Sequence, residues 1–167
     1  IQLYGRPGSE GVLEGIARDL IDSFAATGTD TRVSWSCSIE DLQGSDIIIF
    51  TAGSPRQAHQ TRNDLALGNA HIVKDFAEKI NAIAPESLLL MITNPVDIMT
   101  HVALKYSGKK PNEVFGIGTH LDSMRLKSAI ASFFKVHVSE VHTRIIGEHG
   151  ESMVPLWSAT TVGGIQI

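Results

Sequence analysis

The chain has 167 residues, and 43% of them are hydrophobic, which is typical of a globular protein. Its 14 Lys and Arg against 18 Asp and Glu give a net charge of −4, whereas a general nucleic-acid binder normally carries a basic excess. No apolar run approaches the roughly 18 residues of a membrane span, so neither nucleic acid nor a membrane is expected as a partner. The single cysteine, Cys37, excludes an intrachain disulfide and favours a reducing, cytoplasmic setting.

Strand-like and helix-like stretches alternate from the first residue. Residues 1–4 predict a short strand, and apolar residues three and four positions apart over 13–24 predict an amphipathic helix. A second strand is predicted over 31–35. Residues 46–51 are apolar on both faces, as in a strand buried within a parallel sheet, and a helix is predicted over 65–83.

The second half continues this alternation. It predicts strands over 88–93, 114–117 and 143–146, a helix after Asn94-Pro95 to about 106, a helix lined by apolar residues over 126–134, and a bent strand over 160–165. The pattern predicts an α/β fold with a parallel sheet. Ligands bind beyond the carboxyl ends of such strands, so the loops that matter follow Tyr4, Thr51, Thr93, Ile117 and Ile146.

The loop after Thr51 contains Gly53, which lets the backbone approach a ligand closely. Arg56 and Arg62 follow, and two guanidinium groups can bind a carboxylate or a phosphate. The alternative is that both are solvated loop charges. Thr61-x-x-Asp64 also fits a capping box that opens the next helix.

The next two loops hold an amide and an ion pair. Asn94-Pro95 is either a simple strand-to-helix turn or an amide placed at the mouth of the sheet. Asp122 and Arg125 lie three positions apart and share a helix face. The alternatives to a catalytic role are a capping box from Thr119 to Asp122 and a local ion pair.

Among seven histidines, only His149 stands between glycines just past an apolar strand. A lone histidine is either structural or an acid/base group. A metal site is not expected, because His149 lacks a metalloprotease helix motif and Cys37 has no partner thiol. Pooled at one end of a sheet, these groups suit proton and hydride transfer on a small anionic carbonyl substrate.

Four segments carry a resemblance to a known family. They are 51–62, 92–97, 116–125 and 146–152, and they stand in the family's order and spacing over nearly all of the chain. With them the sequence resembles the malate dehydrogenases of the lactate/malate dehydrogenase family, in its archaeal-type, lactate-dehydrogenase-like branch.

The resemblance implies a Rossmann-like parallel sheet with helices on both faces, followed by the start of a C-terminal substrate domain. It divides the chain into 1–117, a partial dinucleotide-binding domain, and 118–167, the beginning of the catalytic domain. The Gly-rich first strand and turn have no counterpart, so we expect part of a longer chain. That strand lies mid-sheet in the order 3-2-1-4-5-6, so the first two strands here would lack a neighbour joining them to the third.

The implied activity is reversible hydride transfer between NAD(P)H and oxaloacetate or malate, in the tricarboxylic acid cycle, by a homodimer or homotetramer. His149 would protonate the carbonyl oxygen, and Asp122 would fix its tautomer. Arg125 would clamp the adjacent carboxylate, and Arg62 would polarise the carbonyl. Arg56 would pair with the second carboxylate.

The family resemblance also implies the cofactor residues, which are Gly5, Arg6, Ser9, Thr51, Ala52, Gly53, Asn69 and Asn94. Asn94 would also orient the substrate. Relatives that prefer NAD place an acidic residue in the first of these loops for the ribose diol. Here Arg6 and Ser9 would instead meet a 2′-phosphate, which predicts use of NADP at least as well as NAD. The alternative is that Arg6 is only a turn charge.

Two other functions stay open. The protein would act on another 2-hydroxy acid such as lactate if Arg56, where lactate dehydrogenases usually carry glutamine, did not select a dicarboxylate. It would be an inactive nucleotide-binding remnant if it bound no cofactor.

Overall fold

The computed structural model describes residues 1–55 and 62–167, with side chains for all of these except residues 62 and 63. The chain forms two compact units. The first consists of 1–46 and 79–87, and the second of 47–78 and 88–167.

The first unit is built on two parallel strands, β1 (Gln2–Tyr4) and β2 (Ser34–Ser36), joined by helix α1 (Glu10–Ala26). β2 starts later than the predicted 31–35, because Ser34 pairs with Gln2 at the start of the short β1. Leu13 and Ala17 are buried, but Ile16 and Ile21 on the same predicted stripe are exposed. A helix of 17 residues is about 25 Å long, whereas three-residue strands reach only about 10 Å, so this sheet covers only part of it.

The second unit contains a three-stranded parallel sheet in the order β3-β4-β5. Its strands are β3 (Ile47–Phe50), β4 (Leu88–Met91) and β5 (Val114–Gly116). Helices α2 (Arg62–Ile83) and α3 (Val96–Ser107) connect them. β1 and β2 form a separate sheet, which agrees with the expectation that the first two strands lack a neighbour joining them to the third.

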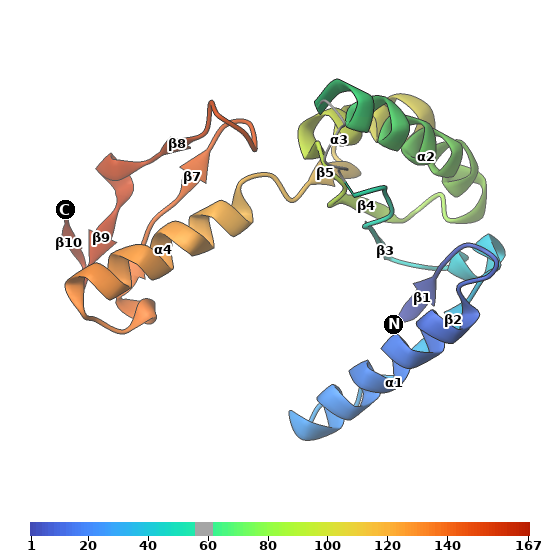
Figure 1. Cartoon of the computed structure of the whole chain (residues 1–167), viewed down its shortest axis with the longest axis horizontal. Helices are drawn as coiled ribbons and strands as arrows, with labels where there is room; N and C mark the ends of the chain where they lie inside the picture. The colour runs from blue at the N-terminus through green and yellow to red at the C-terminus, as the bar shows by residue number, and fades with distance from the viewer. Residues whose placement is uncertain (56–61) are drawn as a thin grey trace. The chain divides into compact units, whose positions relative to one another are not determined.

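Both connecting helices pack on one face of this sheet (Figure 1). Phe76 of α2 lies against Phe50, with ring centroids 4.8 Å apart. Phe50, Met91 and Gly116 form one row across the strands, and α3 packs against its Gly116 end. Right-handed crossovers that step in the same direction put their helices on the same side of a sheet.

The opposite face of β3 is exposed, so the prediction that this strand is buried on both faces was wrong. Ile47 and Ile49 are 56% and 58% exposed, while the alternate residues Ile48 and Phe50 are buried. The cause is the placement of α2 and α3 on the other side of the sheet. An apolar run therefore identified the strand correctly but did not tell which face is covered.

The C-terminal part of the second unit surrounds helix α4 (His120–Phe134). Ile130 and Ala131 of α4 form a small core with Val141, and Leu126 and Val162 pack against it. Three short antiparallel strands lie at this core, β6 (Val141–His142), β9 (Thr161–Val162) and β10 (Ile165–Gln166). The β9–β10 hairpin is the bend predicted over 160–165.

Only the last two residues of the strand predicted over 143–146 form a strand. They form β7 (Ile145–Ile146), which pairs with β8 (Val154–Pro155), whereas β6 ends at His142. Between them, the buried Thr143 bonds to Thr160 through their hydroxyl groups, 2.9 Å apart. β7 leads directly into the loop that holds His149.

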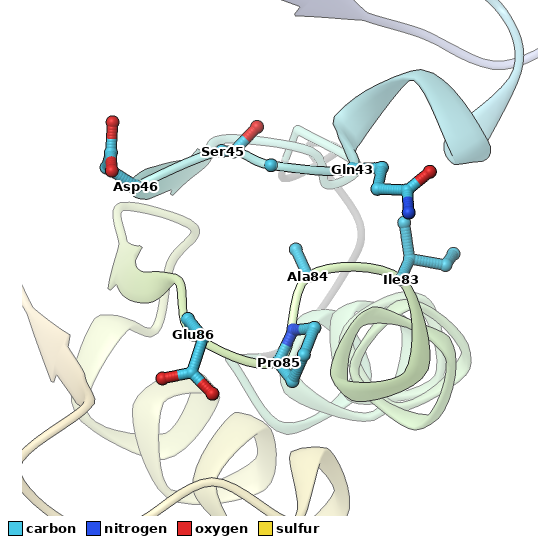
Figure 2. Close-up of a pocket in the computed structure, with 8 residues that line it drawn as sticks. Gln43, Ser45, Asp46, Ile83, Ala84, Pro85 and Glu86 are labelled. Atoms are coloured by element: carbon cyan, nitrogen blue, oxygen red, sulfur yellow. The ribbon is translucent and has the colours of Figure 1, made fainter.

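A pocket of about 320 Å³ lies in the first unit, between the residues before β3 and those before β4. Its lining includes Gln43, Ser45, Pro85 and Glu86, and Figure 2 shows the Glu86 carboxylate pointing away from the other side chains. These residues precede their strands, whereas the predicted ligand loops follow them. The pocket is therefore separate from the predicted site.

No helix among the described residues is long and apolar enough to cross a membrane.

The packing of α3 on β5 gives a stability prediction. A Cβ on Gly116 would lie 2.6 Å from Thr100 Oγ1, which is held by its bond to the Val96 carbonyl, and 3.2 Å from Val96 Cγ2. We expect Gly116→Ala to lower the free energy of unfolding by roughly 1–3 kcal/mol. Gly68→Ala in α2 is the matched control. It meets nothing within 4 Å and should raise stability by about 0.5–1 kcal/mol. Thermal melts that shift in the same direction would contradict this assignment.

Candidate active site

The loops after β3 and β4 are joined by a buried amide. Asn69 of α2 is 2% exposed. Its Oδ1 accepts the backbone N–H of Ser54 at 2.8 Å, and its Nδ2 donates to the Asn94 carbonyl at 2.7 Å. Asn69, which the family resemblance assigns to cofactor binding, therefore holds the two predicted ligand loops together. The side chain of Asn94 is exposed beside it.

Gly53 is needed by the protein's own packing. A Cβ there would lie 2.7 Å from Thr93 Cγ2 and 3.2 Å from Asn69 Oδ1. Thr93 also donates its hydroxyl to the Ala52 carbonyl at 2.7 Å. The glycine therefore lets the loops after β3 and β4 come together, a reason that the sequence did not reveal.

A histidine and a carboxylate meet at the start of α4. His149 Nδ1 lies 2.6 Å from Asp122 Oδ2, and the Asp122 side chain is only 8% exposed. The His149 side chain is 31% exposed. Among the described residues its Nε2 has no hydrogen-bond partner, so this nitrogen can exchange a proton with a ligand.

Asp122 also binds an arginine. Arg125 Nη1 donates to Asp122 Oδ1 at 3.3 Å, while 67% of the arginine side chain is exposed. The predicted local ion pair is thus present together with the histidine contact. The alternative of a capping box was wrong, because the Thr119 side chain makes no cap bond. Arg125 keeps several donors directed at solvent, enough for a carboxylate.

Two hydroxyl groups fasten the start of α4 to β7. Thr119 Oγ1 donates to the Ile145 carbonyl at 2.6 Å, and the Ile145 N–H donates to Ser123 Oγ at 2.9 Å. Ser123 in turn donates to the Thr119 carbonyl. Sequence analysis missed both positioning residues, because their partner lies more than twenty positions away.

The histidine lies in the turn between β7 and β8, residues 147–152, which we call the His149 turn. Gly147 has a φ of +93°, and a Cβ there would lie 3.3 Å from the Ser152 carbonyl. The Asp97 carboxylate of α3 accepts the backbone N–H of His149 at 3.0 Å. Asp97 was also missed, although an acidic residue in a helix's first turn at this sheet edge was the available signal.

The first-unit residues predicted to bind the cofactor occupy the turn before α1. Arg6 is exposed, and its guanidinium has no partner among the described residues. Ser9 Oγ donates to the Arg6 carbonyl at 2.6 Å. Gly5 has a structural role, because a Cβ there would lie 2.6 Å from Ser9 Oγ.

Glu10 fills the N-terminus of α1. Hydrogen bonds from its own backbone N–H and from that of Gly8 lower the pKa of its carboxyl group. A carboxylate therefore already occupies the place where a helix would attract an anion. A phosphate at this turn would depend on the side chain of Arg6.

Arg56 lies outside the described residues, and so does the side chain of Arg62, whose backbone begins α2. Within the part of the chain that the structure describes, no group of three His, Cys, Asp or Glu side chains could hold a metal ion.

Comparison with known proteins agrees with this geometry. Residues 1–116 match the family described as lactate/malate dehydrogenase, NAD binding domain, and residues 119–167 match the α/β C-terminal domain of the same family. The chain belongs to the lactate/malate dehydrogenase family.

Individual relatives include archaeal enzymes. The chain is 54% identical over 153 residues to a malate dehydrogenase from Methanothermobacter thermautotrophicus, covering 92% of this chain and 47% of the relative. It is 50% identical over 167 residues to an L-2-hydroxycarboxylate dehydrogenase (NAD(P)(+)) from Methanocaldococcus jannaschii, covering 99% and 53%. The solved malate dehydrogenase from Picrophilus torridus superposes with a TM-score of 0.91 at 34% identity, covering 100% and 53%. The chain thus spans about half the length of the curated relatives it matches.

The buried amide gives a second stability prediction. Asn69→Ala removes the hydrogen bonds to the Ser54 N–H and to the Asn94 carbonyl, which should cost about 0.5–1.5 kcal/mol for each bond lost. Asn69→Asp keeps an acceptor for Ser54 but sets a carboxylate against the Asn94 carbonyl, so it should also destabilise. The control is Asn81→Ala, an exposed residue of the same helix, with an expected change within about 0.5 kcal/mol. Denaturant unfolding measures all three, and equal stability of the two alanine variants would refute the role.

Proposed function

We propose that this protein is a malate dehydrogenase that transfers hydride reversibly between NAD(P)H and oxaloacetate or malate. The observation that carries the proposal is the contact of His149 Nδ1 with the nearly buried carboxylate of Asp122, beside the exposed guanidinium of Arg125. This group combines a proton donor with a binder of carboxylate. Family membership and the names of the relatives support the same reaction.

The residues present fit a dinucleotide cofactor by the chemistry of their donors. Arg6 has an exposed guanidinium suited to a phosphate, and Asn94 has an exposed amide able to bond a carboxamide. When bound, the reduced nicotinamide supplies the hydride. Thr51, Ala52 and Gly53 are exposed in the loop after β3, and the buried Asn69 of α2 holds that loop beside the Asn94 main chain. Contact of these four residues with the cofactor remains a prediction.

The proton comes from His149. Its Nδ1 is bonded to Asp122, so Nε2 delivers a proton to the carbonyl oxygen and takes it back in the reverse direction. Asp122 fixes the orientation of the ring and stabilises the positive charge of the imidazolium. Because Asp122 is shielded from solvent, water competes little for its oxygens.

Arginines bind the dicarboxylate. Arg125 is bonded to Asp122 through one nitrogen only, which leaves its other donors for the carboxylate next to the carbonyl. Arg62 would polarise the carbonyl, and Arg56 would pair with the second carboxylate. These two roles remain predictions from the family resemblance, and Arg56 decides between a dicarboxylate and another 2-hydroxy acid.

NADP is proposed as a cofactor at least as good as NAD. Support comes from the exposed Arg6 at the turn after β1, where the acidic residue of NAD-preferring relatives is absent. Glu10 accepts hydrogen bonds at the helix N-terminus, and Ser9 donates its proton to the Arg6 carbonyl. The specificity would therefore depend on Arg6.

The same resemblance also predicts a boundary near 117 between a dinucleotide-binding and a substrate domain, a homodimeric or homotetrameric assembly, and a role in the tricarboxylic acid cycle. A cytoplasmic location is predicted from the single cysteine, Cys37. The matches to the two family domains, over 1–116 and 119–167, support the domain boundary.

The acid/base role is tested by His149→Asn in the full-length protein. We expect kcat for oxaloacetate reduction to fall by on the order of 10²–10⁴, the usual contribution of a positioned acid. Binding of reduced cofactor should change less than about twofold, since the ring acts on the substrate. Steady-state kinetics with oxaloacetate and pyruvate, together with fluorescence titration of the cofactor, measure both effects.

The matched control is His101→Asn, an exposed histidine of α3 that should keep full turnover. Unchanged kcat in His149→Asn would remove the proposed mechanism. Faster turnover of pyruvate than of oxaloacetate by the unaltered protein would favour another 2-hydroxy acid, and the absence of saturable cofactor binding would indicate an inactive remnant.

Cofactor choice is tested by Arg6→Ala. Loss of a charge-assisted contact with a 2′-phosphate should raise the KM for NADPH by roughly 10–100-fold and leave that for NADH nearly unchanged. Arg18→Ala is the control, since Arg18 pairs with Glu14 on the surface of α1. A strong preference for NADH that persists in both variants would disprove a role for Arg6.

A further inference from the structure

Among the described contacts, hydrogen bonds at three points link the His149 turn and the strand before it to α3 and α4, and one of these points is the histidine ring. The strand before the turn, β7, is held by Thr119 and Ser123, which bond the main chain of Ile145. The histidine ring is held by Asp122. The third point is the backbone N–H of His149, which donates to Asp97 Oδ2 at 3.0 Å.

The third point is needed because the turn is rich in glycine. Gly147 and Gly150 flank the histidine, and glycine leaves the backbone with more freedom than any other residue. A bond to the imidazole fixes the ring relative to Asp122. The bonds inside the turn, from Ser152 to the Glu148 carboxylate and from the Gly150 N–H to the Glu148 carbonyl, do not reach His149 itself. A bond to the main-chain nitrogen removes that freedom at the residue itself.

We propose that Asp97 is a positioning residue. It holds the backbone of His149 so that Nε2 of the ring stays directed at the carbonyl oxygen of the substrate. The inference rests on the proposed function, because it matters only if His149 transfers the proton. Asp97 reaches the turn from the first turn of α3, three residues after Asn94. The same helix start therefore carries the predicted nicotinamide contact and the anchor of the proton donor.

A simpler role must be separated from this one. Carboxylates in the first turn of a helix stabilise it through the helix dipole, whatever else they touch. That role depends on charge and tolerates movement of the carboxylate, whereas an anchor for His149 depends on the position of an acceptor oxygen. At Asp97, one substitution can remove the negative charge and keep an acceptor oxygen in place, and another can keep the charge and move the carboxylate.

The experiment compares three variants in the full-length protein. Asp97→Asn keeps an acceptor oxygen in place without the charge, and it should keep kcat within about threefold. Asp97→Glu keeps the charge but moves the carboxylate by one methylene group, and Asp97→Ala removes the acceptor. Both should lower kcat by roughly 10–100-fold, the scale expected for a 1 Å misplacement. The KM for oxaloacetate and the cofactor Kd should change less than threefold in all three.

Melting temperatures show which role dominates. For an anchor, Asp97→Glu melts like the unaltered protein yet turns over slowly, and Asp97→Asn melts slightly lower yet turns over normally. A pure dipole role predicts normal kcat for Asp97→Glu, and that result would overturn the proposal. So would equal kcat values for the Asn and Ala variants. If the Ala variant does not fold, the Asn and Glu pair still decides.

Combination with His149→Asn separates the two hypotheses. If Asp97 acts only through the imidazole, adding Asp97→Ala to His149→Asn should leave the residual turnover unchanged, and a further loss would overturn the proposal. Normal turnover of His149→Asn alone would defeat the proposed function. Impaired His149→Asn with fully active Asp97→Glu and Asp97→Ala would defeat only the role of Asp97.

Discussion

The carboxylate of Asp122 organises the site, because a charge that is only 8% exposed must find partners inside the protein. It finds two, with His149 Nδ1 on one oxygen and Arg125 on the other. One of these comes from its own helix and the other from a turn 27 positions later. Satisfying this one group therefore brings the beginning of α4 and the His149 turn together, and it leaves Nε2 of the imidazole and most of the guanidinium open to a ligand.

Much of this arrangement could be predicted from the sequence, because its signals are local. Spacing of three placed Asp122 and Arg125 on one helix face, and the apolar run before Gly147 placed His149 past the end of a strand. Apolar periodicity likewise predicted α1, α2 and α4, and α3 was expected after Asn94-Pro95. The rule that ligands bind beyond the carboxyl ends of parallel strands then selected the loops that the structure connects through Asn69.

Other features could not be predicted, because a local explanation was already sufficient for each residue. Thr119 fits a capping box, yet its hydroxyl reaches β7 instead. Asp97 is explained locally as an acidic residue in the first turn of a helix, yet it accepts the backbone N–H of His149, 52 positions away. Gly53 suggested a ligand, whereas Thr93 and Asn69 occupy the space of its missing side chain. Sequence pattern alone identifies residues that can make a contact but does not identify the distant partner.

The two anchors of His149 also belong to different family segments. Asp97 lies within the stretch that matches the NAD binding domain, and Asp122 within the stretch that matches the C-terminal domain. In the proposed reaction, a proton and a hydride reach the two ends of one carbonyl group. A proton donor that was bonded only within its own segment would shift with that segment relative to the other. The His149 turn is bonded through its backbone to α3 and through the imidazole ring to α4, so its position is fixed relative to both helices. This double attachment gives a physical reason for the histidine to lie in a glycine-flanked turn of the second segment, which can bond to both helices, and not on a helix of its own.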